Sequence, residues 1–401
     1  MEHEVVVVGG GPAGSACATF LAQRGHPVLL LEKEPETGFR VGESMLPALW
    51  EYWDRLGVID RIEKAGFPIK RGVYFKIGAG EGYLLRTDEF PQYFMRPYTY
   101  HVDRATYDRL LLDNAREKGV DVQLGATVTD VLFEGARATG VAYESRSGGR
   151  RIEKCKVVVD ATGRSTLLAG RLHRRYPHPR LRKVAFFTHF AGAGRRLNDD
   201  GSTLTDIHAT EGGWLWCIPL RGDLTSIGAV LDVDFVKDRA ASPEELFKAA
   251  VQADSDIAGW LEGAKQVMDL HRIPSISYLS DDFVGDGFLM IGDAALFIDP
   301  IFSAGVTIAM RAADFAAEAV SEGLKTGDTS AAAFKRYEER IRPPLAKITK
   351  MIVNWYGIMG SKDRDNIFEW SRKSPLLRER LIVLLSGGYD KIDLEAISRW
   401  A

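Results

Sequence analysis

A glycine-rich turn between a short apolar strand and a helix restricts the fold of this chain more than any other feature of its sequence. Val5–Val8 is a continuous β-branched run, which is typical of a parallel strand buried on both faces. Gly9-Gly10-Gly11-Pro12-Ala13-Gly14 follows, and then come an Ala- and Leu-rich segment, Ser15–Gln23, and a second apolar run, Val28–Leu31, that leads into Glu32. Strand, glycine turn, helix, strand and terminal acid together predict a Rossmann-type βαβ unit that binds a dinucleotide.

The glycines of the turn have separate expected roles. Gly9 permits the tight turn, Gly11 lets the backbone approach a pyrophosphate, and Gly14 allows the helix to pack closely on the strand. The helix N-terminus then faces the phosphates with its partial positive charge. Glu32 is placed to accept hydrogen bonds from an adenosine ribose, and an acid there favours a ribose without a phosphate.

The apolar pattern changes along the chain. Tyr107–Glu117 is expected to form an amphipathic helix, and Val157–Asp160 is another buried strand that ends in a glycine turn. Three alternating segments then suit a mixed or antiparallel sheet, namely Ala185–Phe190, Trp214–Pro219 and Thr225–Leu231. From Pro243 onward we expect mostly helix, with one strand at Phe288–Ile291.

Composition narrows the class of partner. The formal net charge is −3, so the chain lacks the basic excess that nucleic-acid binding needs. The three cysteines are far apart, which fits a reducing compartment, and the 8 histidines show no metal-ligand spacing. The acidic start argues against a signal peptide, and no stretch reaches the roughly 18 apolar residues of a membrane span. We therefore expect a cytoplasmic protein that binds small molecules, with no metal, no nucleic acid and no membrane span.

Three separated motifs resemble one flavoprotein superfamily. The turn at Gly9–Gly14, the segment Asp160-Ala161-Thr162-Gly163 and the pair Gly292-Asp293 are together similar to the two-domain FAD fold of para-hydroxybenzoate hydroxylase. This resemblance implies that Asp293 binds the ribityl chain of FAD. Taken alone, Asp293 is also compatible with a turn or helix-capping role.

Four further segments resemble the flavin-dependent halogenases, and in particular their phenol and pyrrole branch. Gly42-Glu43-Ser44 with Leu46-Pro47 is similar to the G-E-S-x-L-P loop, and Trp214–Pro219 matches the W-x-W-x-I-P signature. Asp299–Val306 is similar to the D-P-V-F-S-S-G-V loop, with Ala304 in place of a serine. Phe67–Gly72 is similar to the stretch that carries the catalytic lysine of that branch.

The resemblance, which runs from Val5 to about Tyr337, implies a division of the chain. The fold expected is α/β, with a Rossmann-type FAD-binding domain, a mixed β-sheet substrate subdomain and a helical C-terminal region. The expected bounds are 1–70, 98–170 and 280–325 for the discontinuous FAD-binding domain, 71–97 and 171–279 for the substrate subdomain, and 326–401 for the helical region.

The resemblance also implies site residues. Lys70 is the expected catalytic residue, with Lys76 as a second candidate. The residues expected to contact FAD are Gly9, Gly11, Pro12, Ala13, Gly14, Glu32, Lys33, Arg40, Ser44, Arg104, Asp293, Pro300, Gly305 and Val306. The residues expected to bind halide are Ser303, Ala304 and Gly305, and those expected to line the substrate site and its tunnel are Trp214, Trp216, Pro219 and Phe302.

The chemistry that follows from the resemblance is halogenation. In that family FADH2 and O2 oxidise chloride or bromide to hypohalous acid, which an amine such as Lys70 hydrogen-bonds or converts to a haloamine. The substrate expected is an electron-rich phenol or pyrrole, either free or held by a carrier protein. Because the chain has no second dinucleotide fingerprint, a separate flavin reductase is expected to supply FADH2.

Other interpretations of the same residues remain open. A flavin monooxygenase or a geranylgeranyl-reductase-like enzyme could share the fold, and a nonenzymatic flavin-binding module is a third alternative. Trp214 and Trp216 could be an ordinary core pair, and Lys70 an ordinary surface lysine. Phe302 replaces the glutamate that tryptophan halogenases carry before their S-T-G turn, so tryptophan is not the expected substrate. The short region after Pro343 suits a more open site.

Overall fold

A six-stranded sheet carries the glycine turn at the start of the chain. The computed structural model describes residues 3–77, 82–146, 148–359 and 372–392. Within them the sheet runs β19-β20-β10-β1-β2-β6 and is parallel except for the β19–β20 pair. Its strands are β1 (Val5–Val8), β2 (Val28–Glu32), β6 (Asp121–Leu124), β10 (Val157–Asp160), β19 (Val284–Gly285) and β20 (Phe288–Met290). The predicted Rossmann-type arrangement is confirmed.

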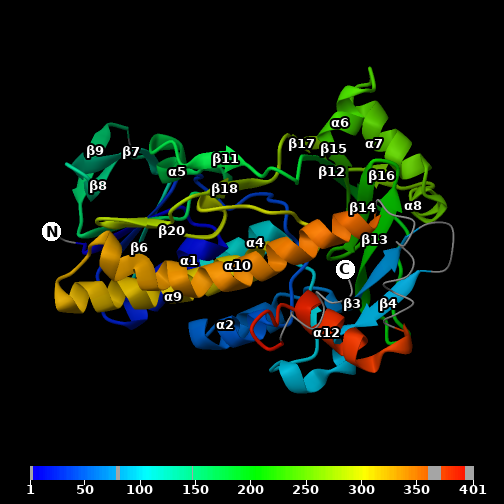
Figure 1. Ribbon diagram of the computed structural model, residues 1–401, viewed down its shortest axis with the longest axis horizontal. Coiled ribbons are helices and arrows are strands. Elements are labelled where there is room, and N and C mark those ends of the chain that lie inside the picture. The colour runs from blue at the N-terminus through cyan, green and yellow to red at the C-terminus, as the bar shows by residue number, and fades with distance from the viewer. Residues whose placement is uncertain (1–2, 78–81, 147, 360–371, 393–401) are drawn as a thin grey trace.

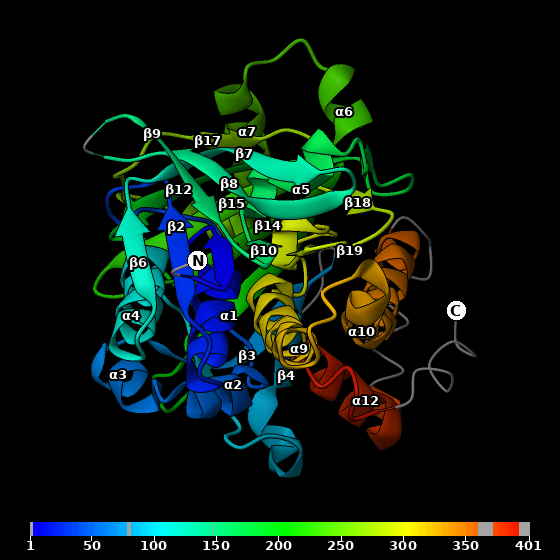
Figure 2. The same ribbon diagram turned by 90° about the vertical axis from the view of Figure 1, so that its left-hand side faces the viewer.

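Both faces of this sheet are covered, which explains the continuous apolar runs. β1 lies between β2 and β10, and Val5–Val7 are fully buried. One face carries α1 (Pro12–Gln23), α4 (Arg104–Glu117) and α9 (Gly305–Thr326), while the other carries a small antiparallel sheet (Figure 2). That small sheet consists of β7 (Thr127–Glu134), β8 (Arg137–Glu144) and β9 (Arg150–Lys154). A strand buried on both faces needs no polar alternation.

Helix α4 begins earlier than its apolar periodicity indicates. We predicted Tyr107–Glu117, whereas the helix begins at Arg104. The side chain of Asp103 accepts a hydrogen bond from the Thr106 N–H at 3.0 Å. This N-cap sets the start of the helix, because it satisfies an N–H group that has no intrahelical acceptor.

The second large sheet has nine strands and is mixed, as predicted. The main path runs β16-β12-β15-β14-β13-β3-β4, with β17 paired to β12 and β5 to β3. All pairs are antiparallel except β13–β3. The strands are β3 (Ile69–Lys76), β4 (Tyr83–Arg86), β5 (Thr99–Tyr100), β12 (Lys183–Ala191), β13 (Thr203–Thr210), β14 (Gly213–Pro219), β15 (Leu224–Asp232), β16 (Lys265–Gln266) and β17 (His271–Ile273).

The two faces of the nine-stranded sheet pack against different parts of the protein. Trp214, Trp216 and Val230 belong to a core shared with the C-terminal helices and the loop at Phe302. We call this the inner face. Leu215 belongs to a core formed with α7 (Pro243–Gln252) and α8 (Ser255–Trp260), on what we call the outer face.

The prediction of one strand after Pro243 was wrong. Four more strands occur there, namely β16, β17, β18 (Tyr278–Ser280) and β19. β16 and β17 extend the edge of β12, and β18 pairs with β11 (Arg175–Pro177). Strands of two or three residues are too short to show an alternating pattern, so the sequence gives no signal for them.

Two helices of the C-terminal region connect the halves of the molecule. α10 (Ala331–Met359) starts beside the six-stranded sheet and ends beside β13 and β14, and α12 (Pro375–Leu385) lies near β3 and β4 (Figure 1). The predicted helical region includes residues 360–371 and 393–401, which lie outside the described residues. The remaining α-helices are α2 (Leu49–Leu56), α3 (Ile59–Lys64), α5 (Leu167–Arg171) and α6 (Val233–Lys237).

No helix among the described residues is both long enough and apolar enough to cross a membrane.

Candidate active site

The three flavin motifs meet at the carboxyl ends of β1, β10 and β20. A Cβ atom added to Gly9 would lie 2.4 Å from the carbonyl oxygen of Ala161, and one added to Gly14 would lie 1.9 Å from the carbonyl oxygen of Gly9. A Cβ atom added to Gly292 would lie 3.2 Å from the Cβ of Ala13, so these two residues are in close contact. Gly9 also has φ +107°, which disfavours any residue with a Cβ. These contacts explain why the turn requires glycine at both positions.

Gly11 differs from its neighbours because it faces open space. A Cβ added to Gly11 would meet no atom within 4 Å, so no part of the described chain requires glycine there. Gly11 is the N-cap of α1, and Pro12 is the first residue of that helix. An open position beside a helix N-terminus is what a bound pyrophosphate needs, so this cradle fits the phosphates of FAD.

The backbone fixes the orientation of the Glu32 carboxylate. The Gly10 N–H donates to Oε2 at 2.6 Å, and the Glu34 N–H donates to Oε1 at 3.0 Å. A carboxylate has further lone pairs, so it can still accept hydrogen bonds from ribose hydroxyls. Lys33 and Arg40 are about half exposed and both pair with Glu34, at 3.7 Å and 3.4 Å.

Asp293 lies beside two arginines at the end of the six-stranded sheet. Burial raises the pKa of Asp293 to about 6, while Arg164 and Arg104 act in the opposite direction. The guanidinium of Arg104 is held in place by Asp108, at 2.8 Å and 2.9 Å, and by the carbonyl of Val41 at 2.9 Å. The structure therefore brings Asp293 and Arg104 into one polar region.

Lys70 is completely buried on the inner face, with 1% of its surface exposed. Its Nζ donates to Oγ of Ser44 at 2.8 Å and to the carbonyl oxygen of Met45 at 3.0 Å. No carboxylate among the described residues pairs with it. Burial lowers the pKa of Lys70 to about 7, so the neutral amine is accessible near neutral pH.

Lys76 points to the opposite face of the same strand. In a regular strand two residues six apart share a face, but the pairing of β3 with β13 shifts by one residue between Lys70 and Val73. Lys76 therefore reaches the outer face, where it pairs with Asp254 at 3.4 Å and Asp256 at 3.0 Å. Burial lowers its pKa, but these two carboxylates outweigh that effect and the net shift is upward.

The tryptophans of β14 form a buried aromatic surface on the inner face. The rings of Trp214 and Trp216 are 5.9 Å apart, and the Trp216 ring lies over Gly228 of β15. Trp216 Nε1 donates to the hydroxyl of Ser226 at 3.1 Å. Pro219 ends the same strand and is also buried.

Phe302 joins this aromatic surface to the C-terminal helix α10. Its ring lies 5.5 Å from that of Trp355, which in turn lies 5.1 Å from the ring of Phe75 on β3. Because the side chain is buried in this aromatic group, the position offers packing and no general base.

The predicted halide loop ends in the N-terminus of α9. The N–H of Ser303 donates to the carbonyl of Pro300 at 2.9 Å, so that amide is already used within the turn. Ala304 is the N-cap, and helical Gly305 and Val306 follow, whose N–H groups have no acceptor inside the helix. A Cβ on Gly305 would meet no atom within 4 Å. The amides suited to an anion are therefore those after Ser303.

Asp299, at the start of this loop, is linked to the tryptophan surface through Tyr356 of α10. The hydroxyl of Tyr356 donates to Oδ2 of Asp299 at 3.0 Å and accepts from Nε1 of Trp214 at 2.7 Å. Burial raises the pKa of Asp299 to about 7, and hydrogen bonds from Ile301 N–H and Tyr356 oppose that shift. We did not predict Tyr356, because nothing in the sequence of α10 marks it.

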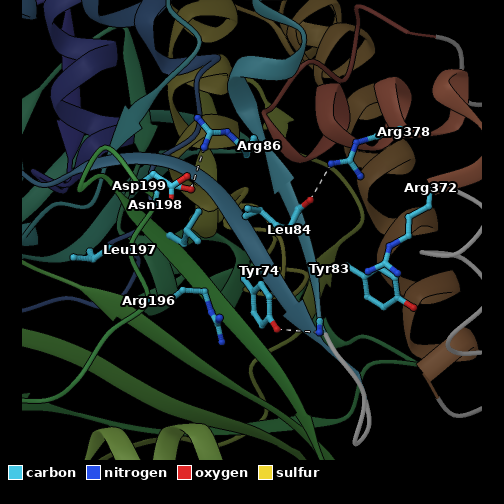
Figure 3. Close-up of a pocket in the computed structure, with 12 residues that line it drawn as sticks. Tyr74, Tyr83, Leu84, Arg86, Arg196, Leu197, Asn198, Asp199, Arg372 and Arg378 are labelled. Carbon is cyan, nitrogen blue, oxygen red and sulfur yellow. Dashed lines mark hydrogen bonds between the residues drawn. The ribbon is translucent and has the colours of Figure 1, made fainter.

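A pocket of about 570 Å³ lies at the β4 edge of the nine-stranded sheet, next to α12 (Figure 3). Its lining includes Tyr74 and Leu204, which both project from the face opposite to Lys70. Arg86, Arg196 and Arg378 also line it, and each already pairs with a carboxylate of the chain. Tyr83, which packs against the inner core, also lines the pocket, whereas Lys70 does not.

A cluster of His208, Asp254 and Asp256 near this pocket has metal-ligand geometry. Lys76 pairs with both carboxylates, and Arg196 approaches Asp256 at 3.5 Å. Two cations already compensate the acids, so the cluster is an internal ion-pair network.

A Rossmann-type sheet with a glycine turn for FAD, next to a mixed β-sheet, is the arrangement found in two-domain FAD-dependent oxidoreductases. The fold and the site therefore place the protein in this class. Comparison with known proteins identifies the family. The family model described as tryptophan halogenase matches residues 4–96 and 85–376, and the chain belongs to this family of flavin-dependent halogenases.

Curated relatives and solved structures agree with this assignment. The chain is 34% identical to a 1H-pyrrole-2-carbonyl-[peptidyl-carrier protein] chlorinase of Pseudomonas fluorescens, over 96% of this chain and 89% of that protein. It is 31% identical to the corresponding brominase of Pseudoalteromonas luteoviolacea, over 96% and 92%. The flavin-dependent brominase Bmp2 superposes with a TM-score of 0.86 at 29% identity, and the myxobacterial chondrochloren halogenase CndH with 0.84 at 30%. These structures cover 96% of the chain, and the chain covers 94% and 96% of them.

These findings confirm the predicted fold, the predicted enzyme class and the use of FAD. They favour halogenation over the monooxygenase and reductase alternatives.

Proposed function

We propose that this enzyme halogenates an electron-rich aromatic ring, a pyrrole or a phenol, that is attached to a carrier protein. The two curated relatives, from Pseudomonas fluorescens and Pseudoalteromonas luteoviolacea, act on a pyrrole carried by a peptidyl-carrier protein. Phe302 supplies no base where tryptophan halogenases use a glutamate, which argues against free tryptophan as the substrate. A pyrrole or phenol needs no such base to be attacked by an electrophilic halogen.

The observation that carries the proposal is the placement of Lys70. Its amine is fully buried, with no carboxylate partner among the described residues, on the same face of the sheet as Trp214 and Trp216. Burying an uncompensated lysine is costly, so chains seldom do so without a functional reason. An amine in that place can receive hypohalous acid and direct the halogen to one ring position.

The residues expected to hold FAD have distinct tasks. Gly11 and the start of α1 would bind the pyrophosphate, Glu32 the ribose, and Asp293 with Arg104 the remainder of the cofactor. When bound, FADH2 supplies the two electrons with which O2 is activated to oxidise a halide. The N–H groups that follow Ser303 would hold chloride or bromide. The aromatic surface at Trp214 and Trp216 would exclude water and keep the organic substrate away from the flavin.

Two partners complete the proposed reaction. A separate flavin reductase delivers FADH2, because the sequence has one dinucleotide fingerprint only. O2 is the oxidant. Rapid oxidation of NADH by the purified protein alone would contradict the need for a reductase.

A turnover assay tests the proposal. The purified protein is supplied with a flavin reductase, FAD, NADH, O2 and bromide, and with pyrrole and phenol acids either free or loaded on carrier proteins. We expect a product whose mass shows bromine, formed mainly from carrier-bound substrate. A product that gains only oxygen, with or without bromide, would identify a monooxygenase instead.

Substitution of Lys70 tests its assignment. We expect Lys70→Ala to lose about 100-fold or more of the halogenation rate, as is usual for a group at the reacting centre. Lys248→Ala, which removes an exposed lysine on α7, is the control and should leave the rate unchanged. Equal rates for Lys70→Ala and the wild type would show that Lys70 has no catalytic role.

A further inference from the structure

Lys70 is the first member of a buried chain of hydrogen bonds that extends from Ser44 to three residues outside the sequence motifs. Oγ of Ser44 lies 2.9 Å from Oγ1 of Thr205, which lies 2.9 Å from Nε2 of His101. Nδ1 of His101 lies 2.9 Å from Oγ1 of Thr203. All five side chains are at least 95% buried, so water does not supply alternative partners.

The far end of the chain fixes the direction of the two hydrogen bonds made by Thr203. Oγ1 of Thr203 lies 2.9 Å from the carbonyl oxygen of Ile69, which can only accept, so the Thr203 hydroxyl must donate to it. Because the Thr203 hydroxyl hydrogen is used in that bond, its oxygen can only accept a hydrogen bond from His101. Nδ1 of His101 must therefore carry a hydrogen and donate to Thr203.

The direction of the remaining bonds depends on His101 being neutral. Its ring is fully buried, with Lys70 close by and no carboxylate in contact among the described residues. Burial, and after it the Lys70 charge, hold the pKa of His101 well below its usual value, against a weaker opposing effect of the Pro219 carbonyl. A neutral ring with a hydrogen on Nδ1 has a bare Nε2, which accepts.

Each group in the chain therefore donates a hydrogen bond to the next group, from Lys70 to the carbonyl of Ile69. The Thr205 hydroxyl donates to Nε2 of His101, so the Ser44 hydroxyl donates to Thr205. Oγ of Ser44 is left with lone pairs for Lys70, which donates to it and to the carbonyl of Met45. A neutral amine has two hydrogens, and both are now used. The nitrogen lone pair has no partner among the described residues.

We propose that His101 and Thr205 are positioning residues that keep the lone pair of Lys70 free for the electrophilic halogen. This inference rests on the proposed function of Lys70. The transfer it serves is balanced: the nitrogen lone pair forms the N–X bond as the O–X bond of hypohalous acid breaks. The hydroxide that leaves takes one amine hydrogen and becomes water. Halide oxidation supplies the hypohalous acid, so no other oxidant is needed.

The first test is the tautomer of His101, which can be read whether or not the protein halogenates anything. Histidine labelled with ¹⁵N reports by NMR which ring nitrogen carries hydrogen, and the His101→Gln variant identifies the signal by its loss. We expect a neutral ring with hydrogen on Nδ1 between pH 6 and pH 8. A ring with hydrogen on Nε2, or on both nitrogens, would overturn the inference without touching the proposed function.

The second test breaks the chain at Thr205. Thr205→Val keeps the shape and removes the hydroxyl, so the Ser44 hydroxyl can turn and donate to the lone pair of Lys70. We expect the halogenated product formed per O2 consumed to fall about tenfold, the effect of losing one hydrogen-bond arrangement at the reacting group. O2 consumption and the release of free hypobromous acid, measured with a thiol trap, should persist.

Two variants complete this test. Thr205→Ser restores the hydroxyl and should restore the coupling. Thr188→Val is the matched control, because Thr188 is a buried threonine of β12 whose hydroxyl donates once, to Met268 at 2.6 Å, on the outer face. Wild-type coupling in Thr205→Val, or a parallel loss of O2 consumption and product, would overturn the inference. Absence of halogenated product from the wild type would instead refute the proposed function.

Discussion

The hydroxyl of Tyr356 donates to the carboxylate of Asp299 at 3.0 Å, and this contact joins helix α10 to the loop that leads into α9. The same hydroxyl accepts from Trp214 at 2.7 Å. Lys183 lies 3.9 Å from the centre of the Tyr356 ring and pairs with Asp232. One side chain from the C-terminal region thus holds together the aromatic surface and the predicted halide loop.

Replacing Tyr356 by Phe should destabilise the protein. The change removes two buried hydrogen bonds and leaves the Trp214 N–H and one Asp299 oxygen without a partner. We expect the free energy of unfolding to fall by about 1–3 kcal/mol, measured by urea denaturation. Tyr176→Phe, which alters an exposed tyrosine, should change it by less than about 0.5 kcal/mol. A Tyr356→Phe protein as stable as the control would show that the link contributes nothing.

Lys70 should make stability depend on pH. Above pH 7 the buried amine is mostly neutral in the folded state, whereas in the unfolded chain it keeps its proton up to about pH 10.5. Unfolding therefore takes up one proton in this window, and raising the pH stabilises the folded protein. Relative to Lys70→Met, the wild type should gain about 1.4 kcal/mol per pH unit between pH 7 and pH 10.

Below pH 7 that difference should become constant, because the lysine is then protonated in both states. The measurement is urea denaturation of the flavin-free proteins at several pH values. Lys248→Met should give a flat difference throughout. A flat difference for Lys70→Met as well would mean that the folded lysine titrates normally.

Replacement of Gly228 by any larger residue should destabilise the protein, because the indole of Trp216 covers Gly228. An added Cβ would lie 2.3 Å from the ring, so Gly228→Ala must displace Trp216 and its hydrogen bond to Ser226. We expect a loss of about 1–3 kcal/mol in stability, seen as a lower unfolding midpoint. Gly259→Ala, in α8 where the added Cβ meets no atom, should be neutral or stabilising by up to about 1 kcal/mol.

Replacement of Gly11 should weaken FAD binding and leave the stability of the fold almost unchanged. Since an added Cβ meets no atom of the described residues within 4 Å, Gly11→Ala should unfold at the wild-type midpoint without flavin. The methyl group would occupy the place of the pyrophosphate, and we expect FAD affinity to fall about tenfold or more. Flavin fluorescence titration measures this. Unchanged affinity would place the pyrophosphate elsewhere.

The sequence was most informative where function limits the backbone. The turn at Gly9–Gly14 could be interpreted from its pattern alone, because only glycine satisfies the φ of Gly9 and the contact of Gly14 with the backbone. The alternating strands β12, β14 and β15 were also predicted, since each has one face toward each core. Patterns of this kind can be recognised in a single sequence because their residues are close together in the chain.

Contacts between distant segments could not be predicted. Thr205 and His101 are 104 residues apart in the chain, and no local pattern connects either of them with Lys70. Tyr356 and Asp299 are 57 residues apart. Such pairs depend on how sheets and helices pack, which periodicity does not specify. The strands β16–β19 were missed for the opposite reason, because they are too short to have a period.

The shifted pairing between β3 and β13 places Lys70 and Lys76 on opposite faces of the sheet, although they are six residues apart in the chain. A regular strand with the same residues would project both lysines from one side, so either the inner face would lose Lys70 or the outer face would lose Lys76. The chemistry proposed for Lys70 therefore depends on how β3 pairs with β13 as well as on the type of residue. A designer who transplants the motif into another scaffold must copy the shifted pairing together with the lysine.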